Sequence, residues 1–64
     1  PNVIVVNFAE PENPSFVTTS VEVEEELWPV DQAEQNEMIE ELRAEQINGN
    51  GQTRVFSHVF VKEV

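Results

Sequence analysis

With 64 residues, the chain is long enough for one small domain and too short for two. Thirteen acidic residues outnumber three basic ones, which gives a formal net charge of −10 at pH 7. Such a surface repels nucleic acid and anionic membranes, because binding to either needs positive charge. The lack of cysteine excludes disulfides and thiolate metal sites, and a single histidine cannot build a histidine-rich metal site.

The composition also bears on how the domain is stabilised and where it resides. A chain of this size buries only about 60% of the surface that its unfolded form exposes, so stability is marginal. Without disulfides or a metal, a second subunit is the remaining way to add stability. No basic-then-apolar signal segment opens the chain, and no apolar run approaches the roughly 20 residues of a membrane span. We expect a cytoplasmic protein without a cofactor.

Two strands are predicted in the first part of the chain. Asn2–Phe8 is an unbroken β-branched run, typical of a strand that is covered on both faces or central in its sheet. Ala9–Ser15 contains Pro11, Asn13 and Pro14 and predicts a loop. Phe16–Glu26 alternates, which predicts a half-buried edge strand whose inner face carries Val17, Thr19, Val21 and Val23. We expect a hairpin with a connection longer than two residues.

The only convincing helical period follows, over Asp31–Gln46. Asp31 is expected as the N-cap, with Glu34 three residues later as in a capping box. Just before the helix, Trp28 is expected to plug the core beneath the helix start. The segment 47–51 contains two Asn-Gly steps and predicts a left-handed C-cap. The apolar arc of the helix predicts its core face, made by Met38, Ile39 and Leu42.

The last predicted strand, Thr53–Glu63, completes an α+β fold with the element order ββαβ. A right-handed crossover through the helix places this strand beside the first one. The result is a three-stranded antiparallel sheet of order 2-1-3, with the helix packed on one face and residues 1–64 forming a single domain. The third strand is apolar on both faces: Val55, Ser57, Val59 and Val61 on one, and Phe56, His58 and Phe60 on the other.

Catalytic patterns are weak, and we assign no catalytic or metal-binding residue. Ser57 and His58 are adjacent, so on a regular strand they point to opposite faces and cannot form a nucleophile–base pair. The many carboxylates occupy outward positions, whereas catalytic carboxylates need a concave site that moves their pKa values apart.

Acidic residues repeat along the helix at spacings of three and four, which predicts a negative array for a basic protein partner. Four acids at the end of the second strand, Glu22, Glu24, Glu25 and Glu26, could extend this array. The alternative is that the acids only keep a small protein soluble. The predicted partner-binding residues are Glu34, Glu37, Glu41, Glu45, Glu22 and Glu24.

Aromatic side chains on the outer sheet face predict a second contact surface, because one helix covers only one face. A two-fold homodimer, formed face to face or through the edges of the third strand, would bury them. The alternative is that the loop or the sheet twist covers them within one chain. The predicted dimer interface comprises Phe16, Phe56, His58 and Phe60.

We therefore expect a non-enzymatic protein-interaction module, in its sharper form one that counters a DNA-binding protein by mimicking phosphate charge. It is expected to form a homodimer, to meet a basic protein surface, and to bind neither nucleic acid nor membranes directly. The alternative is a small ligand-binding or enzymatic subunit with a pocket formed between two chains, around His58.

Overall fold

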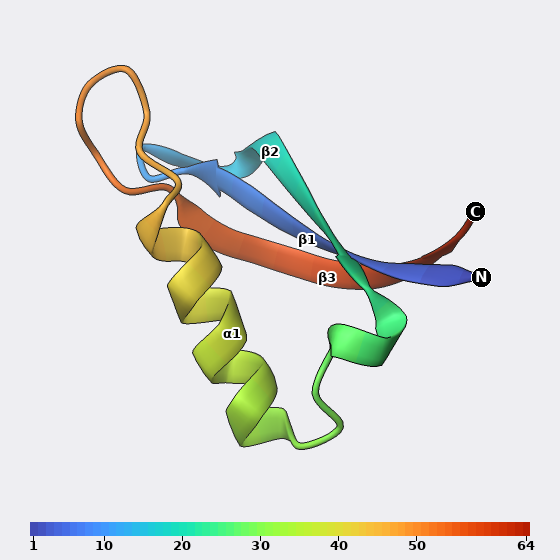
Figure 1. Ribbon diagram of the computed structural model, residues 1–64. Coiled ribbons are helices and arrows are strands. Elements are labelled where there is room, and N and C mark those ends of the chain that lie inside the picture. The colour runs from blue at the N-terminus through green and yellow to red at the C-terminus, as the bar shows by residue number, and fades with distance from the viewer.

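The computed structural model describes all 64 residues and shows three strands and one α-helix in the predicted ββαβ order. The helix lies below the sheet in Figure 1, and the two chain ends lie side by side at the right. A hydrogen bond from the Val64 amide to the Pro1 carbonyl, 3.0 Å long, joins these ends. The elements are β1 (Asn2–Glu10), β2 (Asn13–Glu24), a 3₁₀ turn (Glu25–Leu27), α1 (Gln32–Ala44) and β3 (Val55–Glu63).

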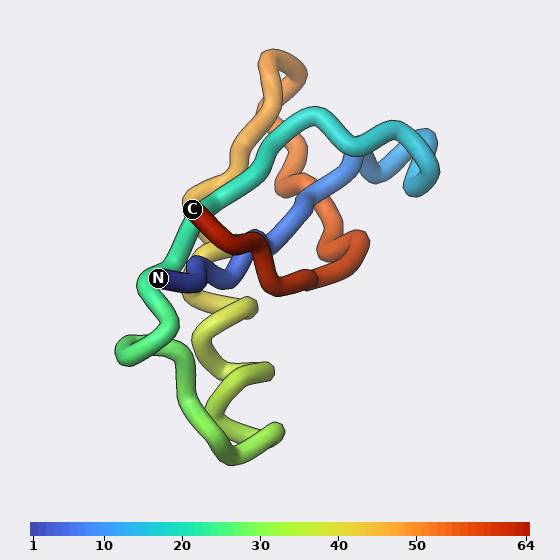
Figure 2. Tube along the Cα trace, turned by 90° about the vertical axis from the view of Figure 1, so that its right-hand side faces the viewer, coloured from blue at the N-terminus to red at the C-terminus, as the bar shows by residue number.

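The sheet has the predicted order β2-β1-β3, and β1 pairs antiparallel with both neighbours. Six consecutive residues of β1, Ile4–Ala9, are buried, which confirms that the β-branched run is the central strand. Helix α1 covers one face of the sheet, and no other element covers the opposite face (Figure 2). We call that opposite face the outer face.

The β1–β2 hairpin is tighter than predicted. Glu10 pairs with Asn13, so only Pro11 and Glu12 connect the strands. Neither connecting residue has a positive φ, so this turn is not one of the primed types that match the twist of a hairpin. Two register shifts next to the turn, on either side of Ala9, accommodate the mismatch. Pro14 is tolerated because β2 is an edge strand.

Register shifts also place three residues on a face other than the predicted one, one in β2 and two in β3. Val17 pairs with Ala9 and Thr19 with Phe8, so Val17 and Thr19 lie on opposite faces, contrary to the simple alternation. In β3, Phe56 pairs with Phe8 whereas His58 pairs with Asn7, which leaves Ser57 as an extra, bulged residue. The faces predicted for Val55 and Phe56 are therefore wrong. Phe56 lies on the α1 side with Phe8, and Val55 lies on the outer face with Ala9.

Helix α1 begins as predicted and ends differently. The Asp31 carboxylate accepts a hydrogen bond from the Ala33 amide, which confirms the N-cap, whereas Glu34 makes no bond back to Asp31. The C-cap residue, Glu45, is right-handed, so the predicted left-handed cap is wrong. Of all residues, only Gly51 has a positive φ, and it lies in the turn that leads to β3. The turn closes instead around Asn48, whose side-chain oxygen accepts hydrogen bonds from two backbone amides.

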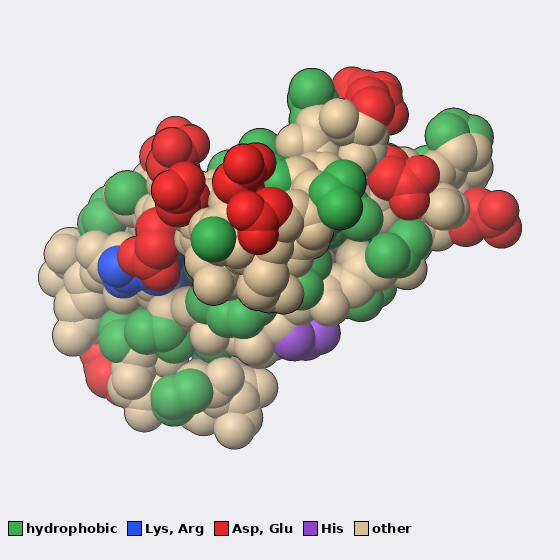
Figure 3. Space-filling model, turned by 90° about the horizontal axis from the view of Figure 1, so that it is seen from below, with side chains coloured by type: hydrophobic (Ala, Val, Ile, Leu, Met, Phe, Trp, Pro, Cys, Tyr) green, Lys and Arg blue, Asp and Glu red, His purple; other side chains and the backbone are tan.

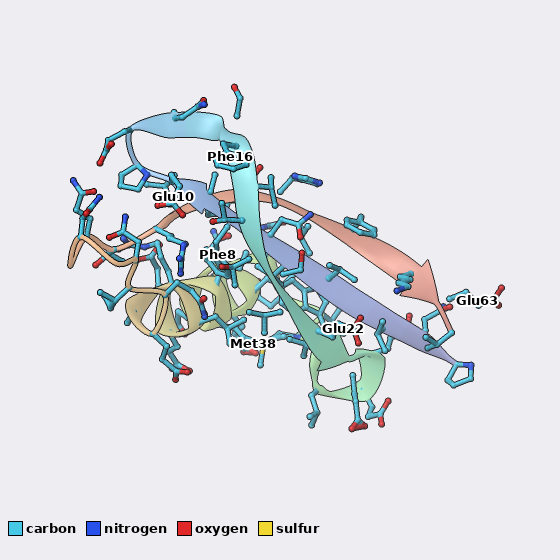
Figure 4. All side chains as sticks on the ribbon, turned by 90° about the horizontal axis from the view of Figure 1, so that it is seen from above. Phe8, Glu10, Phe16, Glu22, Met38 and Glu63 are labelled. Atoms are coloured by element: carbon cyan, nitrogen blue, oxygen red, sulfur yellow. The ribbon has the colours of Figure 1, made fainter.

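The core lies between β1 and α1 and is small. Ile4, Val6 and Phe8 of β1 meet Ile39 of α1, which is the one buried residue of the helix. Figure 4 shows Phe8 over the helix. The Phe8 ring meets the Phe56 ring edge to face, with centroids 6.4 Å apart. Partly buried side chains complete the cluster, namely Val21, Val23, Trp28 and Leu42. Trp28 therefore packs on the core as predicted, while Met38 lies half-buried outside the cluster.

Ile39→Ala is expected to lower the free energy of unfolding by about 2–5 kcal/mol, because it removes the one helix side chain that is buried against β1. Urea denaturation at a fixed protein concentration measures this change. Val30→Ala is the control, since Val30 is 99% exposed and its loss should cost no more than about 0.5 kcal/mol. Equal effects of the two substitutions would show that α1 is not held to the sheet through Ile39.

Candidate functional site

Four predicted partner-binding residues, three within α1 and one at its C-cap, form a row along one flank of the helix. Their spacings of three and four residues place them within an arc of about 80°. All four side chains are exposed, and none takes part in a hydrogen bond or an ion pair. We call this surface the acidic row; it consists of Glu34, Glu37, Glu41 and Glu45.

The basic residues do not neutralise the acidic row, because each is paired with an acid elsewhere. Arg43 bonds Glu40 through Nη2 and Nε, at 2.8 and 3.1 Å. This contact raises the pKa of Arg43 and lowers that of Glu40. Arg54 pairs with Glu10, and Lys62 pairs with Glu22. The three basic residues of the chain are thus used on carboxylates outside the acidic row.

Glu22 and Glu24 do not extend the acidic row. They pair with Val5 and Val3 in the register of β1, so their side chains lie on the outer face, whereas α1 packs on the other face. The sheet therefore separates them from the helix carboxylates. Figure 3, which views the molecule from below, shows acidic side chains at several separate places with one basic group among them.

The outer face carries a chain of hydrogen bonds that crosses all three strands. Ser20 of β2 donates to Asn7 Oδ1, and Asn7 Nδ2 donates to His58 Nε2 at 3.1 Å. On the other side of the ring, His58 Nδ1 lies 3.0 Å from Ser57 Oγ. The expectation that Ser57 and His58 point apart is therefore wrong, because the bulge brings both side chains together.

The direction of these hydrogen bonds indicates which ring nitrogen of His58 carries the proton. Because Asn7 presents its amide nitrogen, Nε2 of His58 is the acceptor and the ring proton lies on Nδ1. Nδ1 then donates to Ser57 Oγ. A general base for a serine nucleophile must instead accept the hydroxyl proton, so this tautomer does not activate Ser57.

The structure brings together only part of the predicted dimer interface. His58 and Phe60 stack on the outer face, with ring centroids 5.8 Å apart. Phe56 lies on the α1 side, opposite Phe8. Phe16 is 58% exposed on β2, at the end of the strand away from Glu22 (Figure 4). Since β1 separates β2 from β3, Phe16 lies on the other edge of the sheet from Phe60.

One polar cluster was not predicted from the sequence, and its centre is Glu10 at the end of β1. The Glu10 carboxylate accepts hydrogen bonds from Thr18 Oγ1 at 2.6 Å, from Asn48 Nδ2 at 2.8 Å and from Arg54 Nε at 2.7 Å. These partners come from β2, from the turn after α1 and from the residue just before β3. The cluster therefore ties the end of β1 to three other parts of the chain.

The same contacts stabilise the charged form of Glu10. The hydrogen bond from Thr18, followed by those from Arg54 and Asn48, lowers the pKa of Glu10 from 4.5 to about 2. The side chain is 22% exposed, so water screens part of each interaction. The cluster acts as a structural tie, with the anion as the form that it favours.

Other features that could mark a site are absent. The chain has no pocket and no group of three or more side chains suited to hold a metal ion. No helix combines the length and the apolar character needed to cross a membrane. A comparison with protein-family models, curated proteins and solved structures found no match to this chain.

Glu10→Gln is expected to lower stability at neutral pH and to have less effect as the pH falls. The folded state binds the Glu10 proton less readily than the unfolded state, so the anion contributes its full stability above pH 4.5. That contribution declines below pH 4.5 and is lost as the pH falls through about 2. Urea midpoints measured from pH 7 to pH 2 should therefore converge for the wild type and Glu10→Gln.

Glu12→Gln is the matched control, because Glu12 is an exposed neighbour that makes no hydrogen bond or ion pair. It should follow the wild type at every pH. A constant difference in urea midpoint between the wild type and Glu10→Gln down to pH 2 would contradict the lowered pKa of Glu10.

Proposed function

We propose that this chain is a cytoplasmic, non-enzymatic interaction module whose acidic row binds a basic protein surface. The observation that carries the proposal is that the acidic row has no compensating charge, because all three basic residues of the chain pair with acids outside it. Like charges four residues apart destabilise a helix by a few tenths of a kcal/mol per pair. A row that lowers helix stability while remaining free of partners within the chain is suited to a partner outside it.

The sharper form of the proposal is that the partner normally binds DNA. Carboxylates at steps of three and four residues recur every 4.5–6 Å or so along the helix axis. Each DNA strand carries a negative charge about every 3.4 Å along the duplex axis. The spacing is therefore of the same order, and a groove lined with lysine or arginine could accept either. Attraction of this kind weakens with salt, because exposed charges are screened.

The test compares two triple variants that carry the same net charge. Replacing Glu37, Glu41 and Glu45 with Gln removes three charges from the acidic row and changes the net charge from −10 to −7. Replacing Glu12, Glu25 and Glu26 with Gln makes the same change at exposed acids outside the row. Each variant is immobilised, exposed to lysate of the source organism at low and high salt, and the bound proteins are identified by mass spectrometry.

We expect a basic protein to bind the wild type and the control variant at low salt and to be released at high salt. The same protein should not bind the acidic-row variant. Addition of duplex DNA should release the same protein if its DNA-binding surface is the one engaged. Equal loss from both variants would show that binding follows net charge alone and would contradict a specific role for the row. The acidic-row variant should remain folded, because removing like-charge pairs does not weaken the helix.

A second candidate is a ligand-binding or enzymatic subunit whose pocket forms between two chains. The hydrogen-bonded chain through Ser20, Asn7, His58 and Ser57 is the observation that favours it. His58→Gln separates the two candidates once a biological activity is assayed. Loss of activity in a folded His58→Gln variant, with the acidic-row variant active, supports the second candidate, and the reverse supports the interaction module.

A further inference from the structure

The free edge of β3 exposes backbone groups in a defined pattern. In the β1–β3 register, Val64 follows the pairing Asn2↔Glu63, and its amide bonds the Pro1 carbonyl. Hydrogen-bonding direction alternates along an antiparallel strand. The N–H and C=O groups of Phe60 and Lys62 therefore point toward β1, and those of Val59 and Val61 point out of the sheet, where no strand lies.

The two edges of the sheet differ in how they resist pairing with another strand. The β2 edge has Pro14, the charged residues Glu22 and Glu24, and two register shifts, all of which discourage a further strand. From Val55 to Val61, β3 has no proline and no charged residue. Its one irregularity, the bulge at Ser57, lies toward one end and leaves 58–63 regular. The β3 edge is therefore open to strand addition.

Charge favours a second copy of the chain as the occupant of this edge. Of the three basic residues, Arg54 lies just before β3 and Lys62 lies within it, whereas Glu63 is the one acid of that segment. Segment 54–63 thus has two positive charges and one negative charge, in a chain whose net charge is −10. Glu10 and Glu22 pair with these two basic residues, and Glu63, the one acid of segment 54–63, has no basic partner. Repulsion between two copies along this edge is therefore weak.

Side chains along β3 also suit a symmetric contact. Val59, Phe60 and Val61 are 39%, 44% and 59% exposed, although they stand next to the most buried strand of the sheet. In a two-fold arrangement the same residues from each copy meet, with valines on the α1 side and Phe60 on the outer face. The contact would cover apolar area as well as satisfy free backbone groups.

We propose that a second copy of this chain pairs its β3 antiparallel with β3 of the first, which makes one continuous six-stranded sheet. The new hydrogen bonds join the outward-pointing groups of Val59 and Val61. The contact uses none of the acidic row, so both copies keep that surface available.

Amide hydrogen exchange on the wild-type protein, followed residue by residue by NMR, tests the pairing directly. The proposal expects Val59 and Val61 to exchange as slowly as His58 and Phe60, because both sets of amides are then hydrogen-bonded. Exchange rates that alternate along the strand, with the Val59 and Val61 amides exchanging as fast as those of the exposed turn 49–52, would overturn the proposal. Alternation together with a doubled molecular mass would also overturn it, because that result indicates stacking through the outer face.

A pair of matched lysine variants locates the contact by sedimentation equilibrium. Val59→Lys places a charge on the β3 edge strand, and Val17→Lys makes the same change on β2 at a residue of similar exposure, 39% against 37%. The wild type and Val17→Lys should have twice the 7.3 kDa chain mass, and Val59→Lys should have the mass of one chain. A wild type of single-chain mass, or a Val59→Lys variant that stays double, overturns the proposal. If Val59→Lys fails to fold, the exchange pattern of the wild type decides.

Discussion

The central position of β1 is the constraint on which the rest of the structure depends. It is the one strand paired on both sides, and its six buried residues account for most of the buried part of the chain. The accessible surface of the molecule, 4276 Å², is close to the roughly 4,200 Å² expected for a folded monomer of this mass. The small core is therefore a consequence of chain length, and a single helix can cover only one face of the sheet.

The small number of basic residues likewise limits which acids can form ion pairs. With three basic residues, the chain forms three ion pairs, and each pair has a local structural setting. Arg54 joins the Glu10 cluster, Arg43 pairs along the helix, and Lys62 reaches across the outer face to Glu22 at 3.9 Å. No basic residue remains for the acidic row. The same placement leaves β3 with one basic and one acidic residue, and the charge distribution is consistent with the two proposed contact surfaces, the acidic row and the β3 edge.

Sequence patterns were sufficient for the fold and insufficient for the details near the bulges. The β-branched run of β1, the helical period and the N-cap at Asp31 led to the correct element order and sheet order. Alternation assigned the faces of Val21, Val23, His58 and Phe60 correctly. It failed for Val17, Val55 and Phe56, which lie beyond the register shifts. No glycine or other local signal marks the bulged residues Thr18 and Ser57.

The candidate sites were also predictable from the sequence only in part. Exposure of the acidic row followed from helical spacing, because neighbours three and four residues apart share a flank. The Glu10 cluster could not be predicted, since its partners lie 8, 38 and 44 residues away along the chain. The contact between Ser57 and His58 depends on a bulge, and the outward direction of the β3 amides depends on the register with β1.

The open β3 edge and the minimal core both support the proposal that this chain works through association with a second copy. The thermal unfolding midpoint of the wild type, measured by calorimetry over a roughly 100-fold range of protein concentration, tests this claim most directly. If folding is coupled to pairing, the midpoint rises with concentration, because mass action favours the paired state. A midpoint that stays constant over the same range would contradict the claim.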